Sequence, residues 1–175
     1  HHVGHGGLAD RTGINDLLKA LPLVRSNVKF IINSQIDIDR IEDNRVEVRK
    51  GNVKNYWDLW NEGDVFLFPT NQEMISMPFN EALSSGMPVL TTAFDFFKEQ
   101  LPEDWLIKPK QIMPIKLHRR SMNYAFLDPE AIANKIDEWA NKDISKDSEL
   151  ANNLAEKISW KNLRSQWVNL FKSLL

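Results

Sequence analysis

Two glutamates, Glu73 and Glu81, are the residues of this sequence best suited to chemistry. Glu73 follows an apolar run that ends at Phe68, and seven residues separate the two glutamates. A carboxylate can accept two hydrogen bonds from a vicinal diol such as a ribose. Glu73, nearer the strand end, could hold a sugar hydroxyl or stabilise developing positive charge. The pattern alone equally allows a solvated loop residue at Glu73 and a helix-dipole partner at Glu81.

The backbone between these glutamates predicts an anion site. Pro78 is typical of a first helical position, and Gly86 is typical of the residue that follows a helix. We therefore expect a helix that begins at Pro78 and presents the backbone N–H groups of Ser76, Met77 and Phe79. These groups and the helix dipole together favour a phosphate ligand, although Pro78 itself has no N–H to donate.

A glycine-rich segment near the N-terminus is a second candidate for phosphate binding. Gly4, Gly6 and Gly7 follow a predicted strand end, and the backbone of such a loop can approach a phosphate closely. Their spacing matches neither the dinucleotide-binding pattern nor the Walker pattern, so a plain turn is the competing interpretation. His5, within this loop, could face a ligand.

Arg11 strengthens this second candidate, because a guanidinium can clamp a diphosphate with two parallel hydrogen bonds. The alternative is a surface arginine paired with Asp10 or Asp16. Among the histidines and carboxylates we find no spacing typical of a metal site.

Short apolar strands alternate with helices along the chain and would position these residues. This order predicts βαβ units, a parallel sheet and helices on both of its faces, which is a three-layer α/β/α domain. We expect Pro22 to end or kink the first helix and residues 108–126 to be irregular. The two C-terminal helices follow the last strand, so we expect them to pack elsewhere, for example on a neighbouring domain. The expected strands cover 28–32, 45–48, 64–68, 89–92 and 105–107, a turn covers 49–52, and the expected helices cover 14–24, 54–63, 78–85, 129–139, 146–158 and 160–174.

Composition narrows the class of protein. The chain has 175 residues, which fits one domain, and its net charge of −2 argues against a general nucleic-acid or anionic-membrane binder. The one local basic cluster, Lys116 with His118, Arg119 and Arg120, is interpreted as a solvated loop face. The absence of cysteine excludes disulfides and thiolate metal sites. No apolar run approaches the roughly 20 residues needed to span a bilayer.

The first residues look like the end of a strand, and the chain does not begin with Met. His1 and His2 are either the remnant of a tag or part of a native strand. We therefore expect this sequence to be a piece of a longer protein.

The stretch GDVFLFPTNQEMISMPFNEALSSGMPVLTT resembles the C-terminal half of the retaining, nucleotide-sugar-dependent group of GT-B glycosyltransferases. VGHGGLADRTGINDLLKAL resembles the first strand-loop-helix of the same domain in that family, and SWKNLRSQWVNLF resembles its closing helix. The positions that fall on the family pattern are Asp64, Pro69, Glu73, Met77, Pro78, Glu81, Ala82, Gly86, Pro88 and Val89.

The resemblance implies different roles for the two glutamates of the E-x7-E pair. Glu73 would contact the donor sugar and support catalysis, and Glu81 would bind the ribose hydroxyls. The turn after the third strand would help to hold the base. In this sequence that turn corresponds to Arg49, Lys50 and Gly51.

The resemblance also implies a diphosphate site, with backbone N–H groups from Ser76 and Met77. The family usually has an Arg after the first glycine of the N-terminal loop and a Lys in an Arg-Lys-Gly triplet. Here His5 and Thr12 stand at those two positions, and Arg11 is the residue that could take over the clamp.

Taken together, the resemblance implies a single Rossmann-like domain over residues 1–175, with C-terminal helices in 146–175, as one half of a GT-B fold. It would bind a nucleotide diphosphate sugar and transfer the sugar to an acceptor hydroxyl with retention, without a metal or other cofactor. A glycan, lipid or protein acceptor would bind through an N-terminal domain, so we expect this chain alone to bind nucleotide with little turnover. We expect no nucleic-acid partner, no transmembrane segment, and a cytoplasmic location that is compatible with peripheral membrane contact.

Two alternatives stay open from the sequence. The first is a catalytically degenerate module that serves as a scaffold or subunit, and Thr12 in place of the usual Lys is its best support. The second is a nucleotide-sugar epimerase of the same fold, which would need no acceptor.

Overall fold

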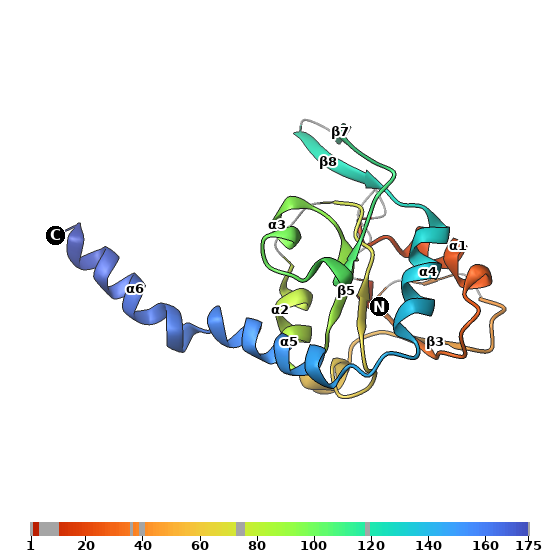
Figure 1. Cartoon of the computed structure of the whole chain (residues 1–175), viewed down its shortest axis with the longest axis horizontal. Helices are drawn as coiled ribbons and strands as arrows, with labels where there is room; N and C mark the ends of the chain where they lie inside the picture. The colour runs from red at the N-terminus through yellow and green to blue at the C-terminus, as the bar shows by residue number, and fades with distance from the viewer. Residues whose placement is uncertain are drawn as a thin grey trace.

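A computed structural model describes residues 2–3, 11–35, 37–38, 41–72, 76–117 and 120–174. It confirms the predicted three-layer α/β/α architecture, because the central strands lie between two groups of helices (Figure 1). One layer contains α2 and α3, and the other contains α1 and α4. These helices cover α1 Ile14–Ala20, α2 Met77–Ser84, α3 Asp95–Lys98 and α4 Pro129–Trp139.

The strands form two parallel sheets of three strands each, in the orders β1-β2-β3 and β4-β5-β6. β1 is short and pairs with β2 at Asn33 and Ser34. A groove of about 750 Å³ lies between β2 and β4 and is lined by Ile31 and Phe66, among others. The strands cover β1 His2–Val3, β2 Phe30–Ser34, β3 Val46–Lys50, β4 Phe66–Phe68, β5 Val89–Thr92 and β6 Leu106–Ile107.

Proline and glycine set the helix boundaries largely as predicted. α1 ends at Ala20, and a 3₁₀ turn η1 (Leu21–Leu23) that contains Pro22 follows it, because proline cannot continue the α-helical hydrogen bonds. α2 begins one residue before Pro78 and is followed by Gly86, whose φ of 74° is a left-handed conformation.

The predicted helix over 54–63 is wrong, because the structure has only a 3₁₀ turn there, η2 (Tyr56–Leu59). Asn55 and Asp58 form a capping box that closes this short turn. Tyr56 and Trp57 are 54% and 68% exposed, so neither side chain belongs to the core. Trp60 does pack inward, with its ring 5.1 Å from that of Phe66.

Two further predictions from the sequence are corrected. Arg49 and Lys50 belong to β3 rather than to a turn, since they pair with β2, and the turn begins at Gly51. Residues 108–126 are not irregular: β7 (Gln111–Leu117) and β8 (Arg120–Phe126) form an antiparallel ribbon. Pro114 concealed β7 in the sequence, because a proline usually argues against a strand. It is tolerated in a two-stranded ribbon at a position whose N–H is not needed for pairing.

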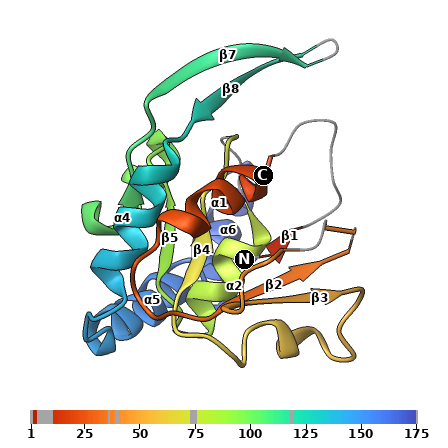
Figure 2. The ribbon, with the colours of Figure 1, turned by 90° about the vertical axis from the view of Figure 1, so that its right-hand side faces the viewer.

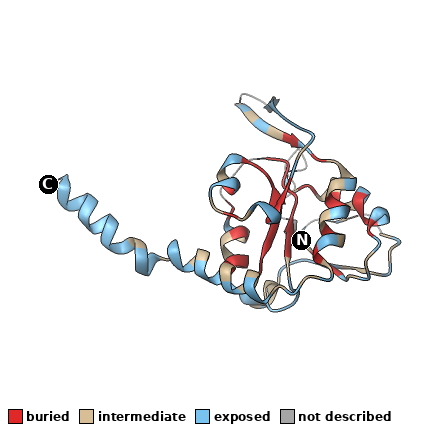
Figure 3. Ribbon diagram, in the orientation of Figure 1, coloured by how far each residue is buried: buried red, intermediate tan, exposed pale blue. Residues whose placement is uncertain are grey.

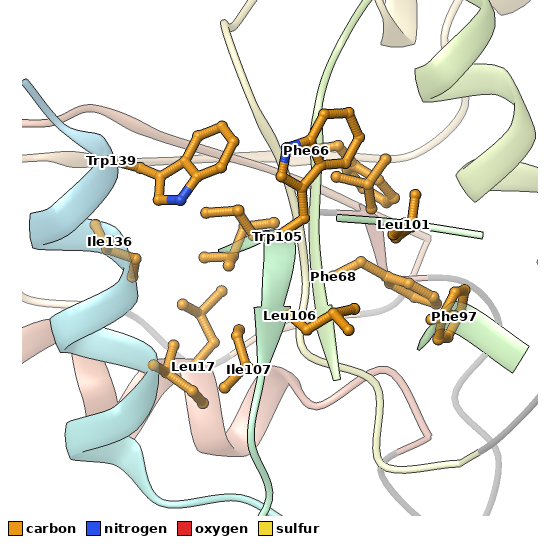
Figure 4. Close-up of a cluster of buried hydrophobic side chains, with 14 of the residues drawn as sticks. Leu17, Phe66, Phe68, Phe97, Leu101, Trp105, Leu106, Ile107, Ile136 and Trp139 are labelled. Carbon is orange, nitrogen blue, oxygen red and sulfur yellow. The ribbon is translucent and has the colours of Figure 1, made fainter. Parts of the chain in front are cut away.

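The buried side chains lie between the helix layers and the strands (Figure 3). Figure 4 shows Trp139 of α4 close to Trp105, with ring centroids 6.1 Å apart and nearly perpendicular planes. The indole Nε1 of Trp105 donates to Asp147 at 2.9 Å, and that of Trp139 donates to the carbonyl of Asp104 at 3.2 Å. Each buried indole therefore keeps a hydrogen-bond partner while its ring adds to the core.

The last two helices behave differently from each other. α5 (Ser145–Lys157) packs beside α2, so the expectation that both would lie away from this domain is wrong for α5. α6 (Trp160–Ser173) projects from the body of the molecule, and Ser159 caps its start by accepting a hydrogen bond from the N–H of Asn162. Within the described ranges, no helix is long and apolar enough to cross a membrane.

Asp137 of α4 predicts a pH-dependent contribution to stability. Hydrogen bonds from Ser26, and then from Arg25, lower the pKa of its carboxyl from 3.8 to about 2. The stabilising interaction is therefore complete above the unfolded-state pKa and is lost as the pH falls through the folded-state value. We expect Asp137→Asn to lower the free energy of unfolding at pH 7, and the difference from the parent chain to shrink between about pH 4 and pH 2.

Urea unfolding at several pH values measures this difference. Asp64→Asn is the control, because Asp64 is exposed. A difference between Asp137→Asn and the parent that stays constant down to pH 2 would contradict this account.

Candidate functional site

The segments that follow the strands lie together at one edge of the sheet, as the parallel arrangement requires. β2 ends at Ser34, β4 at Phe68 and β5 at Thr92, and α2 begins on this edge after the loop that follows β4. Figure 2 shows the strands and α2 from a second direction. This edge contains most of the predicted site residues.

Gly51 forms an open turn at this edge. Its N–H donates to the carbonyl of Ser34 at 2.8 Å, and its φ of 99° is a left-handed conformation. A Cβ atom built at Gly51 would have no described atom within 4 Å. The backbone here is therefore accessible to a flat ligand.

The side chain of Arg49 is held by two carboxylates. Its Nε lies 2.5 Å from Oε1 of Glu47, and its two Nη atoms lie 3.1 and 2.8 Å from the carboxylate of Glu62. Hydrogen bonds from Arg49 and then Lys29 lower the pKa of Glu47 to about 2, and the pKa of Arg49 is raised. Arg49 also lines the groove between β2 and β4. In this arrangement its guanidinium is occupied, so at this turn the backbone around Gly51 is the better candidate for contacting a base.

The segment Pro69–Gln72, which we call the junction, lies directly before Glu73. The carbonyl of Arg11 accepts two hydrogen bonds from it, from Oγ1 of Thr70 at 2.8 Å and from the N–H of Asn71 at 3.0 Å. Thr70 and Asn71 are fully buried. The side chain of Arg11 is exposed, so its backbone is fixed while its guanidinium remains accessible.

Asn71 connects the junction to α1 and β8, and Thr70 connects it to β5. Its Nδ2 donates to Oδ2 of Asp16 at 2.9 Å and to the carbonyl of Ala125 at 3.0 Å. The N–H of Ala125 donates back to the carbonyl of Asn71 at 2.8 Å, which joins β8 to the junction. Oγ1 of Thr92, at the end of β5, donates to the carbonyl of Thr70 at 2.6 Å.

Gly13 is required by its close approach to the junction. A Cβ atom at this position would lie 1.8 Å from the carbonyl oxygen of Pro69. Gly13 also has a φ of 73°, which residues with a side chain rarely adopt. The turn before α1 and the loop after β4 can therefore approach closely only with glycine here.

The start of α2 has the features of an anion site. Ser76 is buried, but its side chain makes no capping hydrogen bond, and the side chain of Met77 is 71% exposed. The side chain of Phe79 is buried against Phe97, with ring centroids 5.2 Å apart, so only its N–H could reach a ligand. N–H groups in the first turn of a helix have no partner within the helix and, with its dipole, attract anions.

Glu81 has a neighbour that the sequence did not reveal. Although Tyr56 is half exposed, partial desolvation of its phenol and its hydrogen bond to Glu81 raise the pKa of Tyr56 to about 12. The carboxylate of Glu81 therefore accepts a hydrogen bond from the hydroxyl group of Tyr56. A ribose would offer it the same kind of donor. No periodicity in the sequence links Tyr56 to Glu81, because the contact joins the 3₁₀ turn η2 to the separate helix α2.

The structure does not place every predicted residue. Glu73 lies outside the described residues, as do Gly4, His5, Gly6 and Gly7. Gln72, the residue before Glu73, is fully buried, and its side-chain Nε2 and Oε1 have no hydrogen-bond partner among the described residues. In the same described ranges, no three His, Asp or Glu side chains are grouped closely enough to hold a metal ion.

Comparison with known proteins identifies a family whose profile matches this chain. A profile of the family described as "Glycosyl transferases group 1" matches residues 2–141. A search of curated proteins found no match.

Several solved structures have the same fold. The chain from the GtfA/B complex has a TM-score of 0.70 at 15% identity, and the match covers 98% of this chain and 35% of that one. HepE (Alr3699) from Anabaena, in complex with UDP and glucose, has a TM-score of 0.68 at 17% identity, with 98% and 47% covered. WaaG, a glycosyltransferase involved in lipopolysaccharide biosynthesis, has a TM-score of 0.67 at 18% identity, with 97% and 45% covered. This chain thus spans less than half the length of these structures, and the likeness confirms its Rossmann-like fold as one half of a GT-B arrangement.

The contact between Gly13 and the junction predicts that alanine will destabilise the chain much more at Gly13 than at Gly63. Gly13→Ala should lower the free energy of unfolding by more than about 4 kcal/mol, because the backbone of Pro69 would have to move and the buried hydrogen bonds beside it would be lost. Gly63→Ala is the matched control, since Gly63 also has a positive φ but has no described atom within 4 Å of a built Cβ.

Gly63→Ala should lower the free energy of unfolding by only about 1–2 kcal/mol, which is the penalty for the left-handed conformation. Denaturant unfolding of both variants measures the two costs. Equal losses would mean that the contact of Gly13 with Pro69 does not matter for stability.

Proposed function

The chain belongs to the Glycosyl transferases group 1 family, and we propose that it is the donor-binding domain of a glycosyltransferase. The donor would be a nucleotide diphosphate sugar, and the full enzyme would transfer its sugar to an acceptor hydroxyl with retention and without a metal. The observation that best supports this proposal is the arrangement at one sheet edge. There the start of α2, the open turn at Gly51 and the Arg11 turn lie on the same side of the sheet.

Each part of the donor has a candidate partner in this proposal. The backbone N–H groups at Ser76, Met77 and Phe79 and the guanidinium of Arg11 would bind the diphosphate as negative charge develops on it. Glu81, oriented by Tyr56, would accept hydrogen bonds from the ribose hydroxyls.

The base and the sugar would lie at opposite ends of the site. Lys50, the last residue of β3, and the turn at Gly51 would contact the base, because the side chain of Arg49 is engaged by Glu47 and Glu62. Glu73 would contact the sugar, and the junction fixes the backbone directly before it. Gly4, His5, Gly6 and Gly7 would complete the diphosphate side. An acceptor glycan, lipid or protein would bind outside this chain.

The shortness of the chain relative to its structural neighbours bears on its activity. HepE was solved with UDP and glucose, and this chain covers 47% of that structure. We therefore propose that the isolated chain binds nucleotide with little turnover.

Calorimetry with UDP, GDP and ADP tests the binding proposal directly. We expect at least one nucleotide to bind, and we expect Glu81→Ala to weaken that binding about tenfold, since two hydrogen bonds to a charged group are lost. Glu149→Ala is the control, because Glu149 is exposed on α5. No binding by any of the three nucleotides would contradict the proposal.

Kinetics of the longer natural enzyme test the roles of the two glutamates. Glu73→Gln should lower kcat much more than Glu81→Ala does, because the first would act on the reacting sugar and the second on the bound ribose. Glu81→Ala should mainly weaken donor binding.

The reverse ranking would overturn these roles. An enzyme that neither transfers nor hydrolyses the sugar would support the scaffold alternative. Interconversion of free nucleotide sugars would support the epimerase alternative. Thr12 in place of the usual Lys is the sequence feature that supports the scaffold alternative.

A further inference from the structure

The groove between β2 and β4 separates the two sheets of this domain. Among the described residues, β2 pairs with β1 and β3, and β4 pairs with β5, but β2 and β4 do not pair with each other. The groove has a volume of about 750 Å³, and Ile31 of β2 and Phe66 of β4 belong to its opposite walls. Protein interiors contain few voids larger than a water molecule, so a space of this size calls for an occupant.

The walls of the groove show what kind of occupant it fits. Ile136 of α4 lines it from one helix layer, and Trp60 after η2 and Met87 after α2 line it from the other. Its mouth is polar, because the exposed Lys29 and Asp64 lie there, at the amino ends of β2 and β4. An element that is apolar on two faces and reaches solvent at one end matches these walls. A strand in the middle of a parallel sheet has this character.

The backbone along the groove also favours a strand. The N–H of Phe66 donates to the carbonyl of Pro88 at 2.8 Å, so Phe66 faces β5. Successive residues of a strand direct their backbone groups to opposite neighbours, and Val65 therefore directs its N–H and C=O toward the groove. A small apolar ligand could fill a cavity of this size, but it would leave such backbone groups unpaired. A strand would both fill the groove and pair with its edges.

The position of β1 shows where this strand would come from. β1 pairs in parallel with the end of β2, with His2 opposite Asn33. Figures 1 and 2 both place the start of β1 beside β4. Continued backwards in the same register, the chain would run alongside Ile31 and Phe30, which line the groove. The line of β1 thus leads directly into the groove.

We propose that the groove holds the stretch of the longer protein that directly precedes His1, as an extended apolar strand continuous with β1. This strand would lie parallel to β2 and β4 and join the two sheets into one, in the order β3-β2-β1-β4-β5-β6. A strand from a second copy of the chain fits less well, because it would have to displace the continuation of β1 at that end of the groove.

The strand would also support the candidate site. Val3, the last residue of β1, is followed directly by Gly4, where the predicted phosphate-binding segment begins. β1 has only two residues, so its extension into the groove would fix the point from which that segment departs. The proposal does not depend on the proposed donor, since its test measures strand pairing and not nucleotide binding.

Short additions to the 175-residue chain test the proposal. One variant carries Val-Ile-Val directly before His1, and two matched controls carry Gly-Ser-Gly or Val-Asp-Val at the same place. Val-Ile-Val should raise the urea midpoint of unfolding by about 1 M or more, because its apolar side chains become buried. Gly-Ser-Gly has no apolar side chain to bury, and Val-Asp-Val would bury an unpaired charge, so neither should raise the midpoint.

Amide hydrogen exchange locates the added strand. In the Val-Ile-Val variant, exchange at the N–H of Val65 should become about tenfold slower or more than in the parent chain, because that N–H gains a partner inside the folded unit. The two control extensions should leave Val65 at the parent rate. Val168, on the projecting helix α6, should exchange equally in all four chains.

The outcomes separate the proposal from its alternatives. A higher midpoint together with slower exchange at Val65, in the Val-Ile-Val variant alone and in a monomer, supports it. Equal values in the three extended chains would overturn it, and so would a higher midpoint without slower exchange at Val65, because the added segment would then pack elsewhere. Exchange at Val65 that is already as slow in the parent would mean that β2 and β4 close on each other, which also overturns it. Slower exchange that appears only with dimer formation, measured by analytical ultracentrifugation, would make a second copy the occupant and overturn it.

Discussion

The carbonyl oxygen of Arg11 makes the contact on which the rest of this structure depends. It accepts hydrogen bonds from Thr70 and Asn71, which lie in a different βαβ unit of the chain. These donors are fully buried, so losing the contact would leave polar groups without partners in the interior. The two loops that meet here are those on which the resemblance places the diphosphate clamp and the catalytic glutamate. The same interaction that stabilises the fold thus also fixes the spacing of the candidate site.

Further contacts make this arrangement cooperative. Gly13 lets the backbones approach, Asp16 and Ala125 bind the side chain of Asn71, and Thr92 binds the carbonyl of Thr70. Buried hydrogen bonds that share partners in this way strengthen one another and exclude alternative loop positions. The β7–β8 ribbon is part of this network through Ala125. Its position relative to the site is therefore determined by the same residues.

The sequence predicted the elements whose signals are local. The helices expected over 129–139 and 160–174 match α4 and α6, because caps such as Asp128 and helical periodicity depend on neighbouring residues alone. The family pattern extended this to candidate roles for Glu73 and Glu81. The family pattern could assign these roles because both glutamates belong to one continuous strand-loop-helix segment.

The parts that the sequence missed depend on distant contacts. Asn71 meets Asp16, which is 55 positions away, and Tyr56 of η2 meets Glu81 of α2. No local pattern encodes such pairs. The β7–β8 ribbon was missed for a different reason, since Pro114 and the basic residues near its tip indicated a loop, whereas pairing between its two strands determines its structure.

The central claim is that a nucleotide binds at the sheet edge beside the junction, and amide chemical shifts measured during a UDP titration test it most directly. We predict the largest changes at Gly51, Thr70, Asn71 and the residues from Ser76 to Glu81, with little change along β7. Changes concentrated in the groove between β2 and β4, at Ile31 and Phe66, would place the ligand elsewhere and contradict the account.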